Sequence, residues 1–148
     1  MDTKSKLEDN LREAMKAGDE VRKRTIRMAL AAIKQAEVDR QVVLDEPALA
    51  GILQKEIKMR RESIEEARRA NRPDLVASSE AEINVLDSFL PPALNADELR
   101  TMTEEAIKES GAAAPAEMGK VMKLLLPRVA GRAPNDQVSA LVRQLLQK

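Results

Sequence analysis

Apolar residues recur at intervals of three and four along nearly the whole chain, which is the spacing of one face of an α-helix. No segment shows the sustained alternation of apolar and polar residues that indicates a β-strand. Glycine, proline and small polar residues interrupt the periodic stretches where helices commonly begin or end. The pattern therefore predicts seven helices, at about 4–16, 20–40, 45–71, 73–89, 95–107, 118–129 and 134–145.

The sequence LPPAL at 90–94 is the strongest interruption, because two successive prolines hold the chain extended and cannot continue a helix. Asn95 and Glu98 follow with the spacing of a capping box, which predicts the start of a new helix. We therefore expect an all-α protein with two domains, a four-helix bundle over residues 1–92 and a three-helix bundle over 93–148. With one phenylalanine and no tryptophan or tyrosine, both cores should be aliphatic, with methionines such as Met28 as filler.

The residue types that are missing restrict the chemistry. The chain of 148 residues contains neither histidine nor cysteine, the main ligands of zinc, copper and iron, so we expect no metal and no cofactor. The usual general base near neutral pH and the thiol nucleophile are also missing, and we assign no catalytic residue. The first residues are polar and no apolar run is long enough to span a membrane, which predicts a cytoplasmic protein without a membrane partner.

Charge is balanced over the chain but segregated along it. The 25 basic and 25 acidic side chains give a formal net charge of zero. Residues 93–117 hold two basic and six acidic side chains, a balance of −4, whereas 118–148 hold six basic and one acidic, a balance of +5. Clustered Lys and Arg on a small module are typical of a surface that contacts phosphates. The residues proposed for this contact are Gly119, Lys120, Lys123, Arg128, Gly131 and Arg132.

The same residues also fit a purely structural explanation. Cations near a helix C-terminus are favoured by the helix dipole, so Arg128 and Arg132 can be ordinary solvated side chains. Gly119 lies in a first helical turn, where glycine costs about 1 kcal/mol relative to alanine. Either close packing of another helix or close approach of a phosphate explains its presence. Both alternatives stay open on the sequence alone.

A second basic run lies on the second predicted helix, where no acidic residue occurs between positions 21 and 36. Lys23, Arg27 and Lys34 are spaced by four and seven and therefore share one face. Glu37 and Glu82 each lie beside apolar positions. We expect them to be partly buried structural partners of Arg27, Lys34 or Arg60.

Four blocks carry a resemblance to a known family: TIRMALAAIKQAEVD (25–39), KEIKMRRESIEEARRANRPDL (55–75), AEINVLDSFLPPALNADEL (81–99) and EMGKVMKLLLPRVAGRAPNDQVSALVRQLL (117–146). In this order they resemble the GatB/YqeY family, in particular its stand-alone YqeY-like members. The C-terminal block is similar to the tail domain of the B subunit of tRNA-dependent amidotransferase. Two departures are Phe89, where the family usually has tyrosine, and APND after Gly131-Arg132.

The resemblance implies a four-helix bundle joined to a three-helix bundle and a tRNA-interacting accessory protein that is not catalytic alone. Its expected partners are tRNA or another structured RNA, and an amidotransferase or an aminoacyl-tRNA synthetase. One alternative is a component of a carbon–nitrogen ligase with glutamine as amido-N donor. Another is a helical adaptor that binds a protein.

Overall fold

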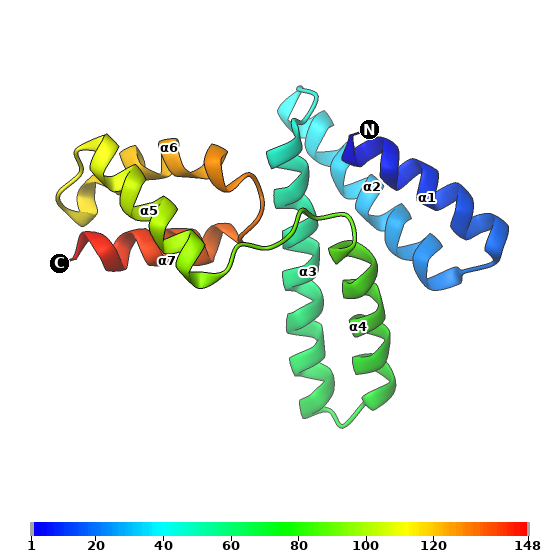
Figure 1. The fold of residues 1–148 in the computed structure, drawn as a ribbon. Coiled ribbons are helices and arrows are strands. Elements are labelled where there is room, and N and C mark those ends of the chain that lie inside the picture. Colours follow the sequence, from blue (N-terminus) through cyan, green and yellow to red (C-terminus); the bar gives the residue numbers. More distant parts are fainter. Residues whose placement is uncertain (1, 148) are drawn as a thin grey trace. The chain divides into compact units, whose positions relative to one another are not determined.

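The computed structural model describes residues 2–147, and all its regular elements are helices (Figure 1). The all-α fold class is confirmed, because no strand occurs in these residues. The elements are α1 (Thr3–Ala17), α2 (Glu20–Arg40), α3 (Glu46–Arg69), α4 (Pro73–Asp87), α5 (Ala96–Ser110), the 3-10 turn η1 (Pro115–Glu117), α6 (Met118–Val129) and α7 (Asn135–Leu146).

Local sequence explains most helix ends. The side chains of Asp19 and Asp45 each accept a hydrogen bond from a backbone N–H in the first turn of α2 and α3. Gly18 ends α1 in the left-handed conformation, with φ of 68°, which costs glycine little. Asn95 and Glu98 form the predicted capping box at the start of α5.

The contacts divide the chain into two compact units, Met1–Leu90 and Pro91–Lys148, and the division falls inside the proline segment. The division into a four-helix domain over 1–92 and a three-helix domain over 93–148 stays a prediction. In the first unit, α1 packs along α2, α3 packs along α4, and α2 contacts both α3 and α4 (Figure 1). Phe89 packs against both groups of buried residues in this unit. The buried apolar residues are Leu7, Ile26, Ile33, Leu44 and Leu49 in one group and Ala29, Leu53, Ile57 and Leu86 in the other.

The second unit packs α5, α6 and α7 around an aliphatic core. The segment that leads into α5 is fixed to the turn between α6 and α7. The backbone N–H of Leu94 donates to the carbonyl of Arg132 at 2.9 Å, and Nε of Arg132 donates to the carbonyl of Pro92 at 2.8 Å. Arg132 therefore has a structural role within this unit.

A buried ion network joins three helices of the first unit. The side chain of Arg60 on α3 is 8% exposed, and its Nη1 donates to Oε2 of Glu56 at 2.8 Å. Its Nε donates to Oε2 of Glu82 on α4 at 2.9 Å. The other carboxylate oxygen of Glu82 accepts from Nη2 of Arg24 on α2 at 3.1 Å. The predicted pairing of Glu82 with Arg60 is confirmed.

Glu37, near the end of α2, fixes the connection to α3. One carboxylate oxygen accepts from the backbone N–H of Leu44 at 3.0 Å, and the other accepts from Nζ of Lys4 at 3.2 Å. The predicted partners Arg27 and Lys34 are wrong, because Lys4 and the backbone of Leu44 occupy the two carboxylate oxygens of Glu37 instead. The backbone hydrogen bond from Leu44, and next the contact with Lys4, lower the pKa of Glu37.

We predict that Arg60→Ala lowers the free energy of unfolding by about 3 kcal/mol or more, because it leaves Glu56 and Glu82 without their buried cation. The matched control is Arg24→Ala, since Arg24 is 52% exposed and its pair with Glu82 contributes at most about 1 kcal/mol. Urea denaturation of both variants measures the difference. Equal, small effects would show that the network does not stabilise the bundle.

A pH dependence follows from Glu37. Its pKa is lower in the folded chain than in the unfolded chain, so its ionised form stabilises the fold above the ordinary glutamate value of about 4.3. This stabilisation is lost as the pH falls through the lower, folded value. The free energy of unfolding of the wild type should therefore fall more steeply between neutral and acidic pH than that of Glu37→Gln. Parallel pH profiles of the two proteins in urea denaturation would contradict this assignment.

Candidate functional site

The proposed C-terminal basic residues separate into two groups. Gly119, Lys120 and Lys123 are exposed on the solvent side of α6, opposite the buried Val121 and Leu125. No residue within 2–147 forms an ion pair with Lys123, while Nζ of Lys120 lies 3.9 Å from a carboxylate oxygen of Glu117 on the preceding turn. The structure thus brings together only part of the predicted set.

The other three proposed residues, Arg128, Gly131 and Arg132, have partners or structural roles within the second unit. Arg128 pairs with Glu109 on α5, and this hydrogen bond raises the pKa of the guanidinium. Gly131 follows Ala130 in the turn after α6, and both have positive φ, 78° and 50°. Arg132 holds the segment at Pro92, as described above. These positions shape the turn and its attachment.

Gly119 does not pack against another helix. A Cβ atom built at this position has no neighbour within 4 Å, so the packing explanation for this glycine is wrong. The absence of a side chain leaves the backbone of the first turn of α6 open to solvent. The alternative, close approach of a phosphate, stays untested.

The second predicted basic face is a coherent surface on α2. Lys23, Arg27 and Lys34 project within about 40° of one another around the helix axis. Lys23 lies 3.8 Å from Glu20, but neither Arg27 nor Lys34 forms an ion pair within residues 2–147. Nη2 of Arg27 instead lies 3.9 Å from the sulfur of Met15 on α1.

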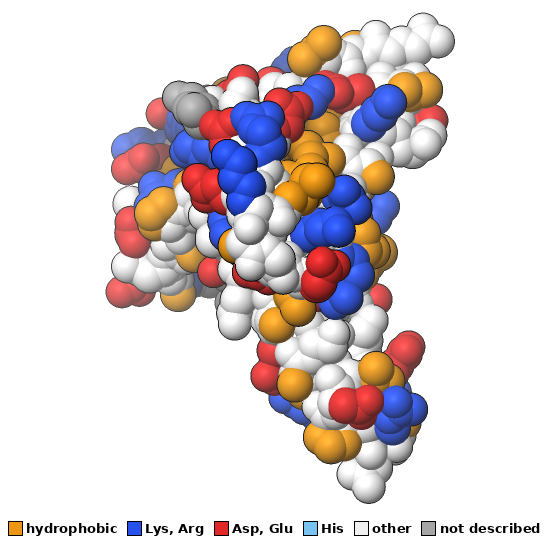
Figure 2. Space-filling view, turned by 90° about the vertical axis from the view of Figure 1, so that its right-hand side faces the viewer, with side chains coloured by type: hydrophobic (Ala, Val, Ile, Leu, Met, Phe, Trp, Pro, Cys, Tyr) orange, Lys and Arg blue, Asp and Glu red, His pale blue; other side chains and the backbone are white. Residues whose placement is uncertain are grey.

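Apolar side chains share this surface, which the sequence analysis did not predict. Met28, expected in the core, is 49% exposed, and Val38 is 62% exposed on the same side as Arg27. Met28 lies at the edge of α2 that faces α3, where its sulfur is 3.7 Å from Nη2 of Arg60. Exposed hydrophobic side chains lie beside Lys and Arg side chains in the view of Figure 2 as well. We call the exposed side of α2 formed by Arg24, Arg27, Met28, Ala31, Lys34 and Val38 the α2 face.

One signal in the sequence could have revealed the α2 face. Met28 lies one position after Arg27, four positions after Arg24 and three positions before Ala31. A strict count at 100° per residue places it at the border between the charged and the buried side. The prediction that Met28 lies in the core rested on its hydrophobicity alone.

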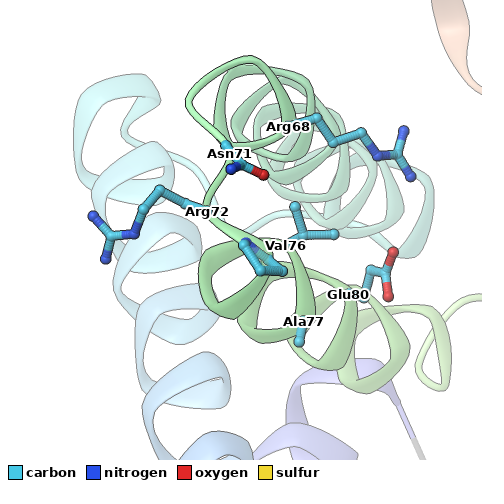
Figure 3. Close-up of a pocket in the computed structure, with 7 residues that line it drawn as sticks. Arg68, Asn71, Arg72, Val76, Ala77 and Glu80 are labelled. Carbon is cyan, nitrogen blue, oxygen red and sulfur yellow. The ribbon is translucent and has the colours of Figure 1, made fainter.

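Two hollows lie elsewhere on the surface. The first, of about 360 Å³, is at the tip of the α3–α4 hairpin (Figure 3). Arg68 and Arg72 point to opposite sides of it, with Val76 between them (Figure 3). Arg68 pairs with Glu65 at 2.9 Å, and Arg72 makes two hydrogen bonds to Asp74. Both cations therefore have carboxylate partners on their own hairpin.

The second hollow, of about 450 Å³, is a groove along α5 in the second unit. Leu94 and Met102 are its partly buried apolar lining, and Asp97, Thr101 and Glu105 are exposed along it. We call it the α5 groove. Glu98 and Arg132 complete its lining.

Residues 2–147 contain neither a metal-binding cluster nor a membrane span. No group of three or more acidic side chains in this range is placed to hold a metal ion. No helix in it combines the length and the apolar character of a membrane span.

Comparison with curated proteins finds fungal relatives with the name "Altered inheritance of mitochondria protein 41, mitochondrial". The relative from Lachancea thermotolerans is 43% identical over 61% of this chain and 49% of its own length. That from Vanderwaltozyma polyspora is 34% identical over 70% of this chain and 57% of its own. That from Pyrenophora tritici-repentis is 31% identical over 89% and 74%. The chain thus spans about half the length of the first relative and less than two thirds of the second.

These relatives correct two predictions. The expected function, a tRNA-interacting accessory protein or a ligase component, is wrong: the relatives are named for the inheritance of mitochondria, and no tRNA or amidotransferase role appears in their names. The expected cytoplasmic location is also wrong, because the same names place the relatives in mitochondria.

The family prediction is confirmed over almost the whole chain. The matched region includes both compact units, with the α2 face in the first and the α5 groove in the second. A family model described as "Yqey-like protein" matches residues 4–146, and the chain therefore belongs to the YqeY-like protein family.

Proposed function

We propose that the chain is a binding protein whose α2 face holds an acidic amphipathic helix of a protein partner. The observation that carries this proposal is the mixture of cations and exposed apolar side chains on one side of α2. A helix with an apolar stripe and flanking carboxylates matches both components of such a face.

The charges of the α2 face suit a helical partner. Arg27 and Lys34 form no ion pair within residues 2–147 and are seven residues apart, about 10 Å along the helix axis. Carboxylates two turns apart on a partner helix have the same separation. Salt bridges of this kind at the rim of an interface steer association and set its orientation.

The apolar side chains favour a protein over a nucleic acid. Met28 and Val38 gain from contact with other apolar side chains, and methionine adapts its shape to different partners. Single-stranded nucleic acids are usually held by aromatic side chains on which bases stack. Phe89, the one aromatic residue of the chain, packs against the core of the first unit and is not part of the α2 face.

The α2 face is also held in position before a partner arrives. Glu82 fixes the guanidinium of Arg24, and Arg60 lies against the sulfur of Met28. Side chains that are already ordered lose less conformational entropy when a partner binds. We infer that the face binds as a rigid surface.

The names of the fungal relatives support a proposal about the cellular compartment. We propose that the chain, or the longer protein of which it is part, acts in mitochondria, as the names of its fungal relatives state for those proteins. Their names connect them with the inheritance of mitochondria, and a binding protein can serve in that process by holding another component.

The binding proposal is tested with a synthetic helical peptide that carries leucines on one side and glutamates flanking them. Arg27→Gln/Lys34→Gln should weaken its affinity at least tenfold in fluorescence anisotropy, because two charge-assisted contacts of about 1 kcal/mol or more are lost. Affinity of the wild type should also fall as salt is added. The control is Lys120→Gln/Lys123→Gln, which removes two exposed cations of α6 and should leave affinity unchanged.

Three results would contradict the proposal. In the first, the wild type binds no acidic peptide at low salt, and in the second, both double variants lose affinity equally. In the third, transfer RNA or anionic vesicles bind the α2 face more tightly than the peptide does, with the same dependence on Arg27 and Lys34. Either ligand would then replace the acidic helix as its partner.

For the compartment, fractionation of cells that make the natural protein is the direct measurement. The protein should sediment with mitochondrial markers and resist protease until the membranes are opened. Recovery in the soluble fraction together with cytosolic markers would refute the mitochondrial assignment.

A further inference from the structure

The α5 groove of the second unit has the properties that the α2 face requires of a partner. We propose that the acidic helix bound by the α2 face is α5 of a second copy of this chain. The inference rests on the proposed function of the α2 face and names its partner. The two surfaces correspond in charge, in apolar contact and in spacing.

The carboxylates along the α5 groove are available for a partner. Asp97 and Glu105 are exposed and form no ion pair within residues 2–147. The other acids of the same helix are engaged: Glu98 accepts from the backbone N–H of Asn95 in the capping box, Glu104 pairs with Arg100 at 2.9 Å, and Glu109 pairs with Arg128. The unpaired carboxylates of α5 therefore lie on the side that lines the groove.

The apolar parts also correspond. Leu94 and Met102 line the α5 groove and are partly buried, so they offer an apolar surface below the carboxylates. Met28 occupies the equivalent place on the α2 face, beside Arg27. Contact between the two methionine side chains removes apolar area from water on both copies.

The spacing of opposite charges is similar on the two surfaces. Asp97 and Glu105 are eight residues apart, about 12 Å along α5, and Arg27 and Lys34 are separated by about 10 Å along α2. Met102 lies between the two carboxylates in the sequence, and Met28 lies between the two cations. Two helices laid side by side can form both charge pairs, with the methionines at the edge of the contact, because Met28 projects about 100° around α2 from Arg27.

The charge distribution of the whole chain permits this association. The formal net charge is zero, so two copies do not repel each other through their overall charge. The acid-free stretch of α2 and the acidic segment 93–117 are instead attractive patches of opposite sign. Because each copy carries both surfaces, two copies can join through two reciprocal α2–α5 contacts in a closed dimer, or each copy can bind one neighbour through α2 and another through α5 in an open chain.

Complementary variants provide the test. Arg27→Gln/Lys34→Gln removes the charges of the α2 face, and Asp97→Asn/Glu105→Gln removes those of the α5 groove, with little change in side-chain shape. In sedimentation velocity at low salt, the wild type should associate as its concentration rises, into a dimer if the contacts are reciprocal and into larger species if they are not. Each variant alone should associate at least tenfold more weakly. Their equimolar mixture should form a dimer and nothing larger, since only one intact pair of surfaces remains.

Several outcomes would overturn the inference. A wild type that stays monomeric at every soluble concentration is one of them. Another is a mixture of variants that does not associate although the wild type does, since a different surface then joins the copies. Circular dichroism melting of each variant confirms that it is folded. If the wild type stays monomeric but still binds the acidic peptide, the proposed function stands and only the second copy as partner is rejected.

Discussion

The buried guanidinium of Arg60 is the interaction on which the first unit depends. A cation taken out of water is tolerated only with carboxylate partners, and here Glu56 and Glu82 provide them from α3 and α4. Through Glu82 the same network reaches Arg24 on α2, and Arg60 itself lies against Met28. The network that orders the bundle therefore also orders the surface that we propose for binding.

This coupling explains why cationic and apolar side chains coexist on α2. Its buried side, with Ile26 and Ile33, packs within the first unit. Its opposite side is exposed. The sequence between positions 21 and 36 contains no acidic residue. The exposed Met28 and Val38 lie beside the cations Arg27 and Lys34 on this side. The proposed partner would contact both kinds of side chain.

The helices were predictable because their signals are local. Asp19, Gly18 and the Asn95–Glu98 capping box act through hydrogen bonds within one turn, so sequence spacing is sufficient. The errors concern contacts between helices. Hydrophobicity placed Met28 in the core, and charge alone paired Glu37 with Arg27 or Lys34, whereas the fold brings Lys4 and Leu44 to it. The α5 groove was also missed, because its lining combines Leu94 and α5 with Arg132 from a turn 38 residues after Leu94 in the sequence.

The C-terminal basic element shows the limit of arguing from charge. Six positions were grouped because they are close in sequence, yet Arg128 pairs with Glu109 and Arg132 anchors the segment at Pro92. Lys120 and Lys123 stay exposed on α6. A positive balance in a segment does not distinguish cations that are neutralised by the fold from cations that are free for a partner. The second basic face, which is less prominent in the sequence, retains Arg27 and Lys34 in that free state.

The methionine methyl groups permit the most direct measurement of the central claim, that the α2 face meets the α5 groove. The chain has seven methionines, of which Met28 lies on the α2 face and Met102 in the α5 groove. Methyl NMR spectra of protein labelled at methionine should show the signals of Met28 and Met102 shifting together as concentration rises and returning when salt is added. The signals of Met59 on α3 and Met118 on α6 should not move. Unchanged Met28 and Met102 signals over a range in which the protein associates would contradict the account.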